Sequence, residues 1–129
     1  MYEAVDTGGS MYVHTFGAYF GVAASIVLTD MKKVKRDSKY EKGSYNSNLI
    51  AMVGTIFLWC FWPSFNGGLT TGNTQMRVIV NTTLALSGSC ITAFAFSALF
   101  NNGRFEMEDV LNATLAGGVV VGSTCDMMQ

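Results

Sequence analysis

The sequence predicts an all-α protein that spans a membrane several times, and three observations lead to this fold class. Half of the 129 residues are hydrophobic and only 13% are charged, whereas about a quarter are charged in soluble domains. Two uncharged stretches run for 23 residues each, from Thr7 to Thr29 and from Val78 to Phe100. Glycine occurs 14 times, and membrane helices contain it more often than soluble ones do.

Four helices are expected, over residues 8–29, 47–69, 76–100 and 108–129 of a single domain. A membrane helix needs about 20 mostly apolar residues, and the first three segments meet this requirement. A soluble helical bundle would need polar faces at helical spacing, which the second and third segments lack. The first segment does not resemble a signal peptide, because Glu3 and Asp6 precede it in place of basic residues.

The basic residues predict how the helices are oriented. Six of the eight Lys and Arg residues lie between Lys32 and Lys42, and the other two are Arg77 and Arg104. Loops rich in Lys and Arg stay on the cytoplasmic side of a membrane. We therefore expect the loop 30–46 to be cytoplasmic, together with residues 101–109. Asp6 is then expected at the outer end of the first helix.

His14 is the one histidine of the chain, and it lies in the first uncharged stretch. An ionisable side chain in a membrane segment is costly to bury and is a functional-site hypothesis by default. Imidazole also exchanges a proton readily near neutral pH. At helical spacing, His14 shares a face with the small residues Ser10, Gly17, Gly21 and Ser25. The alternative is a packed histidine whose nitrogen atoms bond to a neighbouring helix.

The second segment ends in an aromatic run that contains the single proline. Pro63 is expected to bend or end the helix, which would leave Phe65 on irregular backbone. At membrane depth, irregular backbone occurs only where it is buried in protein or lines a cavity. The ring of Phe65 could therefore act as a gate as well as a packing group. Trp59 and Trp62 are expected to be anchors at the membrane interface.

Three long motifs, in order along the chain, resemble the Rh glycoprotein branch of the ammonium transporter family. They occupy residues 6–21 (Asp-Thr-Gly-Gly-Ser followed by the His14 segment), 54–66 and 112–119. The run Trp-Pro-Ser-Phe-Asn at residues 62–66 favours the Rh branch over the bacterial-type ammonium transporters. The resemblance covers essentially the whole chain.

The resemblance implies a fold of eleven or twelve membrane helices, assembled as a homotrimer with one narrow pore in each subunit. This chain would be a partial Rh-type domain, a fragment that spans the fifth to the eighth core helix. The second pore histidine and the second gate ring would lie outside it. The resemblance implies ammonium or ammonia as the substrate and the lipid bilayer as the surroundings, in the plasma membrane, with no cofactor and no nucleic acid.

The resemblance also implies roles for individual residues. His14 matches the first of two paired pore histidines, and Phe65 matches one of two stacked rings that close the outer entrance. Asp6 matches an acid near the outer mouth, and Asn66 is grouped with these residues as a pore candidate. Glu106 falls where relatives carry an acid at the cytoplasmic vestibule. Asn48 falls where relatives often carry another acid, which weakens the assignment of the inner mouth.

The expected process is electroneutral movement of ammonia through a hydrophobic pore. A bare ammonium ion is costly to bury, whereas neutral ammonia is not charged and can bond to an imidazole. Two alternatives are a carbon dioxide channel and a structural membrane partner that does not conduct. An enzyme is not expected, because the sequence contains no Cys/His pair, no phosphate-binding loop and no metal-ligand cluster.

Overall fold

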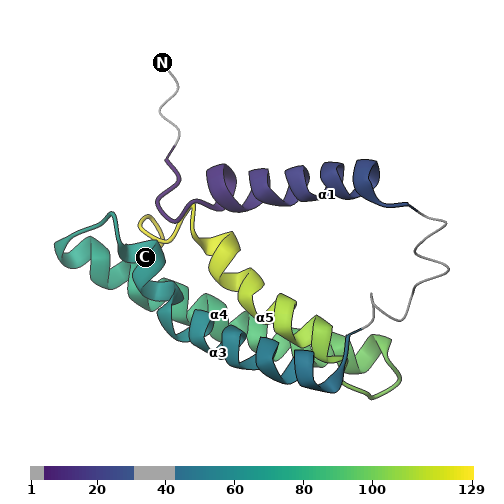
Figure 1. Cartoon of the computed structure of the whole chain (residues 1–129). Coiled ribbons are helices and arrows are strands. Elements are labelled where there is room, and N and C mark those ends of the chain that lie inside the picture. Colours follow the sequence, from purple (N-terminus) through teal and green to yellow (C-terminus); the bar gives the residue numbers. More distant parts are fainter. Residues whose placement is uncertain (1–4, 31–42) are drawn as a thin grey trace.

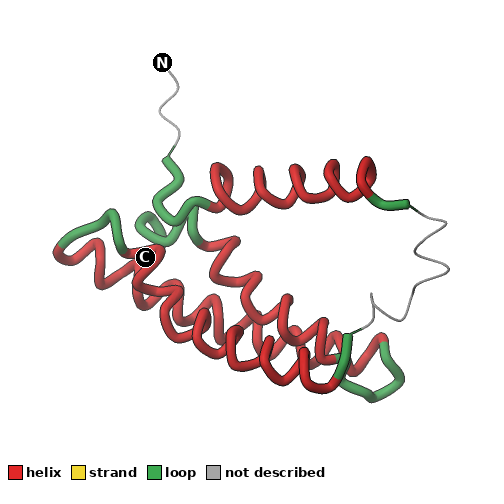
Figure 2. The backbone as a smooth tube through the Cα atoms, viewed as in Figure 1, coloured by secondary structure: helices red, strands yellow, loops and turns green. Residues whose placement is uncertain are grey.

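The computed structural model describes residues 5–30 and 43–129, and it is all-α, as the sequence predicts. Within these residues the elements are η1 (Ser10–Thr15, a π-helix), α1 (Phe16–Leu28), α3 (Tyr45–Gly67), α4 (Gly72–Phe100) and α5 (Met107–Val121). Short loops connect α3 to α4 and α4 to α5 (Figure 2). The lysine-rich segment on which the orientation was predicted lies outside the described residues.

Helices α3, α4 and α5 pack against one another, whereas among the described elements α1 contacts only η1 (Figure 1). The end of α5 returns to the start of η1, where the Gly8 N–H donates to the Gly122 carbonyl at 2.7 Å. One end of the molecule therefore carries η1, the end of α3 and the end of α5. The opposite end carries the start of α3 and the turn between α4 and α5.

The contact between α4 and α5 depends on glycine at residue 117. A Cβ atom at this position would collide with the Ala85 carbonyl oxygen and would lie 2.6 Å from the Ser89 Oγ. Small residues let the backbones of membrane helices approach closely. Gly117 therefore permits the close approach of α5 to the α4 backbone. Gly17 and Gly21 on α1, by contrast, have no described atom near the position of a Cβ.

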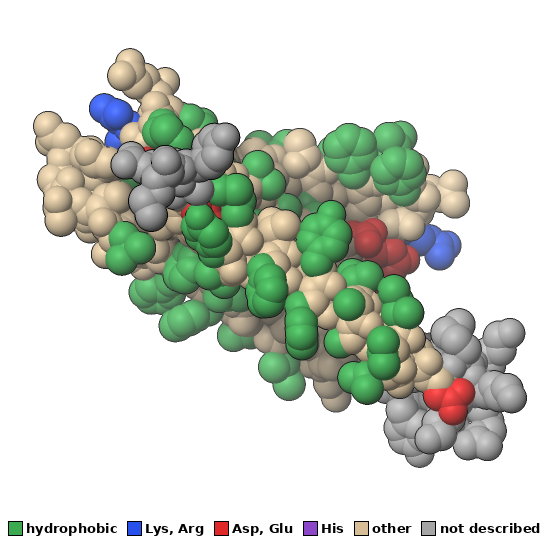
Figure 3. Space-filling view, turned by 90° about the horizontal axis from the view of Figure 1, so that it is seen from above, with side chains coloured by type: hydrophobic (Ala, Val, Ile, Leu, Met, Phe, Trp, Pro, Cys, Tyr) green, Lys and Arg blue, Asp and Glu red, His purple; other side chains and the backbone are tan. Residues whose placement is uncertain are grey.

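Three helical stretches are long and apolar enough to cross a membrane: Ser10–Leu28, Tyr45–Gly67 and Gly72–Phe100. Their apolar side chains are largely exposed, and Figure 3 shows hydrophobic groups spread over the visible face. Soluble proteins rarely expose apolar surface on this scale. These faces are suited to contact with lipid or with further membrane helices.

Helix α3 continues through Pro63 to Gly67, so the expectation of irregular backbone at Phe65 is wrong. Proline is tolerated in membrane helices where nearby hydroxyl groups and local adjustments satisfy the freed backbone groups. The carbonyl freed by Pro63 is that of Trp59, four residues earlier, and the Ser64 hydroxyl adds a separate bond to the Phe61 carbonyl at 2.7 Å. Phe65 and Asn66 therefore project from the last turn of a continuous helix.

Two helix ends differ from the expected bounds. Helix α4 begins at Gly72, four residues before the expected start at residue 76, and α5 ends at Val121 rather than at residue 129. The Asn81 amide of α4 donates to the carbonyls of Cys125 at 2.8 Å and Met128 at 3.0 Å. These side-chain bonds satisfy carbonyls of the final turns without a continued helix.

Candidate functional site

The segment that carries His14 is a π-helix, which the sequence analysis did not anticipate. It follows Gly9, whose φ of 73° is a left-handed conformation that suits glycine. The His14 N–H donates to the Gly9 carbonyl five residues earlier, at 3.1 Å. The Thr15 hydroxyl donates to the Ser10 carbonyl at 2.8 Å. Single π-turns are rare and occur frequently at functional sites.

Ser10 and His14, which were expected to share a face, contact two different helices. Ser10 is buried against α5, where its hydroxyl donates to the Val119 carbonyl and accepts from the Ser123 N–H at 3.0 Å. His14 instead faces the aromatic rings of α3. The segment therefore contacts α5 through Ser10 and α3 through His14.

The imidazole of His14 packs against two aromatic rings of α3. Its centroid lies 5.5 Å from the Trp62 ring with an interplanar angle of 26°, and 5.8 Å from the Phe65 ring at 57°. Its Nε2 atom is buried and has no hydrogen-bond partner among the described residues. An unpaired buried polar atom costs about 1–3 kcal/mol. No described helix satisfies this nitrogen, so the chain leaves a hydrogen-bonding position open beside the rings.

Two open cavities meet at Phe65. The first, of about 460 Å³, is lined by His14, Trp62, Phe65 and three further residues of α3. The second, of about 440 Å³, is lined by Asp6, Tyr12 and neighbouring residues. Phe65 is the residue common to both linings, and half of its surface is exposed. The ring therefore lies between the cavity of His14 and the cavity of Asp6.

Asp6 holds the beginning of the histidine segment. Its Oδ2 atom accepts the N–H groups of Met11 and Tyr12, both at 2.9 Å. A carboxylate at the start of a helix is favoured because it satisfies free N–H groups and complements the helix dipole. The Oδ1 atom is buried without a partner in the described part of the chain. Asp6 thus lines its cavity and fixes η1 at the same time.

Trp62 is a site residue that the sequence analysis missed. It was expected only as an interface anchor, but the indole is half-buried and stacks on His14. It also packs on Gly118, where a Cβ atom would lie 2.6 Å from the Trp62 Cδ1. Trp62 precedes Phe65 by three residues, a spacing that places two side chains on one helix face. That spacing could have identified it.

Asn66 does not line either cavity. Its side chain is fully buried, and its amide nitrogen donates to the Thr82 hydroxyl at 3.1 Å and to the Gly118 carbonyl at 3.2 Å. The structure therefore places Asn66 behind Phe65, within the junction of α3, α4 and α5.

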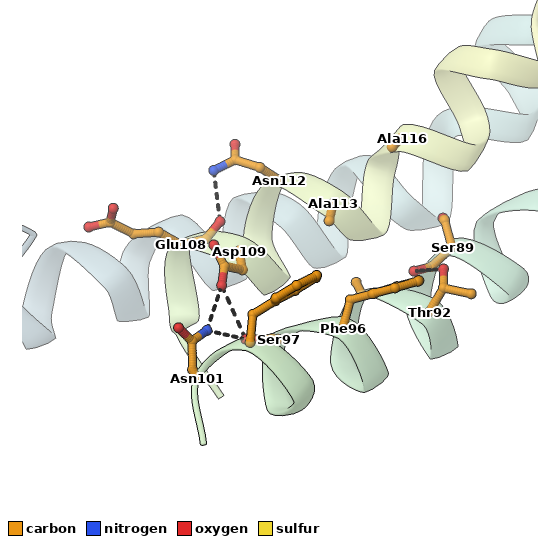
Figure 4. Close-up of a pocket in the computed structure, with 12 residues that line it drawn as sticks. Ser89, Thr92, Phe96, Ser97, Asn101, Glu108, Asp109, Asn112, Ala113 and Ala116 are labelled. Carbon is orange, nitrogen blue, oxygen red and sulfur yellow. Dashed lines mark hydrogen bonds between the residues drawn. The ribbon is translucent and has the colours of Figure 1, made fainter. Parts of the chain in front are cut away.

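At the opposite end, an open groove of about 990 Å³ runs between α4 and α5 (Figure 4). Glu106 does not line it: its backbone N–H donates to the Ser97 Oγ at 2.9 Å, and its residue is exposed. The acids that do line the groove are Glu108 and Asp109. Asp109 accepts from Ser97 at 3.2 Å and from Asn101 at 3.0 Å.

Asn48 lies at this same end. A Cβ atom at Gly43 would be in contact with the side-chain oxygens of both Asn48 and Glu108. Glu108 therefore supplies an acid close to Asn48, the position at which the resemblance implied one. The sequence alone does not show this proximity, because Glu108 belongs to a different helix. Within the described residues, no three His, Cys, Asp or Glu side chains come together as a metal site requires.

Known proteins resemble this chain over nearly its whole length. The family model described as the Ammonium Transporter Family matches residues 1–129. The Rh type B ammonium transporter of Bos taurus is 53% identical over 129 residues, which cover 98% of this chain and 28% of the relative. The Rh type A ammonium transporter of Rattus norvegicus is 49% identical, with the same coverage. The chain thus spans a little over a quarter of the length of these relatives.

A solved structure shows the same arrangement of helices. The structure of Nitrosomonas europaea Rh50, reported with the mechanism of conduction by the Rhesus protein family of channels, superimposes with a TM-score of 0.88. The sequence identity is 37%, and the match covers 98% of this chain and 33% of that one. The chain therefore belongs to the ammonium transporter family, a family of multi-pass membrane transporters and not of enzymes, as a homologue of its Rh-type members.

Proposed function

We propose that this chain forms one wall of an ammonia pathway, with His14 beside the path and Phe65 at its outer gate. The observation that carries the proposal is the buried, unpartnered Nε2 of His14 in a cavity that Phe65 borders. The inner end of the path would pass the acids of the groove between α4 and α5. The complete transporter would be a homotrimer in the plasma membrane.

The chemistry of the two cavities supports ammonium as the species that enters the outer cavity and ammonia as the species that passes Phe65. The carboxylate of Asp6 attracts a cation to the outer cavity, and the face of an aromatic ring contributes about 0.5–2 kcal/mol to cation binding. Beyond the ring the lining is mostly apolar, and a bare ammonium ion would be costly there. Ammonium therefore leaves its proton with water at the outer cavity. The neutral ammonia that remains can cross the inner cavity and hydrogen-bond with His14 Nε2, which in a neutral imidazole either donates or accepts.

The activity can be tested in a chimaera, defined here as the bovine Rh type B transporter with its matching segment replaced by this chain. Vesicles that contain the chimaera should change internal pH in an ammonium gradient, without a current. A chimaera that assembles but adds no ammonia flux to that of empty vesicles would refute the proposal. Carbon dioxide flux with no ammonia flux would support the alternative channel.

Replacing Phe65 by alanine in the chimaera should raise the flux of methylamine relative to that of ammonia. The ring blocks the passage between the two cavities, and its removal favours the larger amine. Phe57→Ala is the matched control, because Phe57 is an exposed ring on the same helix that lines neither cavity. An unchanged flux ratio in Phe65→Ala would mean that the ring only packs.

The orientation of the helices can be tested by labelling. Single cysteines at Thr71 and at Asn102 lie at opposite ends of α4. With Cys60, Cys90 and Cys125 replaced by alanine, an impermeant thiol reagent added to intact cells should label residue 71 and leave residue 102 unlabelled. The reverse pattern would invert the predicted orientation.

A further inference from the structure

Asn66 combines complete burial with a position next to the proposed gate. It occupies the last turn of α3, directly after Phe65, and its side chain is 0% exposed. Its amide nitrogen bonds to Thr82 of α4 at 3.1 Å and to the Gly118 carbonyl of α5 at 3.2 Å. One side chain therefore ties the end of α3 to both neighbouring helices.

The surroundings of Asn66 connect it to the site. Its amide oxygen has no hydrogen-bond partner among the described residues and lies against Gly8, where a Cβ atom would collide with it. Its acceptor residue, Gly118, packs on the Trp62 indole, with a Cβ position only 2.7 Å from Nε1. Asn66 thus fits between the segment that leads into η1 and the helix on which Trp62 rests.

The last turn of α3 needs such a tertiary contact. Pro63 has no N–H, so one bond of the backbone ladder that would hold this turn is missing. The next residues, Gly67 and Gly68, add little stiffness. Phe65 and Asn66 are consecutive residues on this turn, so a movement of the turn that displaces the ring also breaks the two amide bonds.

We propose that Asn66 is a positioning residue that holds the Phe65 ring between the two cavities, and through the ring sets the selectivity between ammonia and larger amines. This inference rests on the proposed function. Asn66 does not contact the substrate; it acts through the orientation of the helix end.

The test measures the ratio of methylamine flux to ammonia flux, for each assembled transporter, in the chimaera. Asn66→Leu keeps a similar volume and removes both amide bonds, so the ratio should rise on the order of three- to tenfold. Thr82→Val removes one bond and keeps the amide, so it should give a smaller rise and remains informative if Asn66→Leu does not fold. A ratio that stays unchanged in Thr82→Val and in any assembled Asn66→Leu overturns the inference.

Asn81→Leu is the matched control, because it is the same substitution on α4 at a residue that lines none of the three cavities. It removes the bonds from the Asn81 amide to the carbonyls of Cys125 at 2.8 Å and Met128 at 3.0 Å. We expect less assembled protein and an unchanged flux ratio. A shift in Asn81→Leu as large as in Asn66→Leu would show a general packing effect and contradict the positioning role.

The double variant Asn66→Leu/Phe65→Ala separates this inference from the proposed function. If Asn66 acts through the ring, the double variant should have the flux ratio of Phe65→Ala alone, whereas independent effects would add. If Phe65→Ala shifts the ratio and the Asn66 and Thr82 variants do not, the positioning role fails and the gate remains. If Phe65→Ala itself has no effect, the gate fails, and the inference fails with it.

Discussion

Replacing Gly117 by alanine should separate α4 from α5 and lower the stability of the chain by about 3 kcal/mol. The new Cβ would collide with the Ala85 carbonyl oxygen and would lie 2.7 Å from the carbonyl carbon. Both are backbone atoms, so a rotamer change cannot relieve the overlap. Movement of α4 would also weaken the bond from Ser89 to the Thr114 carbonyl.

Gly88→Ala is the matched control, because it is a glycine-to-alanine change in α4 with no described atom within 4 Å of the new Cβ. Alanine is favoured over glycine in a helix by about 1 kcal/mol, so this variant should be as stable as the original chain or slightly more stable. Thermal unfolding of the chain in detergent micelles, followed by circular dichroism, compares the two variants. Equal midpoints for Gly117→Ala and Gly88→Ala would contradict the described contact.

The apolar helices could be predicted because a membrane constrains length and composition directly. An uncharged run of 23 residues can be read without knowing which face meets which neighbour. The end of α5 could not be predicted in this way. Beyond Val121 the chain forms turns, and the carbonyls of residues 125 and 128 there accept bonds from Asn81, which lies on another helix.

The candidate site could be predicted in part. His14 stood out because the surrounding sequence contains no other ionisable group, and the structure brings it against Phe65, with Asp6 in the adjoining cavity. The contact of Trp62 with His14 could not be predicted, because an aromatic residue near a helix end is usually expected to be an interface anchor. The π-turn could not be predicted from the hydrophobic periodicity, because that method assumes the same number of residues in every helical turn.

The acids that line the groove at the inner end could not be predicted, for a different reason. Glu106 was chosen by its position along the chain, but the groove is lined by Glu108 and Asp109. The lining depends on the direction in which each side chain leaves the first turn of α5. The Ser97 hydroxyl, from α4, bonds to Asp109 and to the Glu106 backbone and so fixes that direction.

His14→Ala should have the largest effect on transport. The variant removes the hydrogen-bonding and proton-exchanging group from the cavity between Trp62 and Phe65. Positioned acid or base groups contribute on the order of a hundredfold or more to proton transfer, so the ammonia-driven pH change should fall at least about tenfold. His14→Gln is a useful companion, because glutamine can hydrogen-bond and cannot exchange a proton. Recovery of transport in His14→Gln would assign His14 to hydrogen bonding alone.

The most direct test records internal pH and membrane current together, in vesicles that contain equal amounts of assembled chimaera with and without His14→Ala. With His14 present, an ammonium gradient should change the pH and produce no current. With alanine, the pH change should largely disappear, or a current should accompany it because ammonium crosses with its charge. A variant that changes pH at the original rate and without current would show that His14 is not part of the pathway.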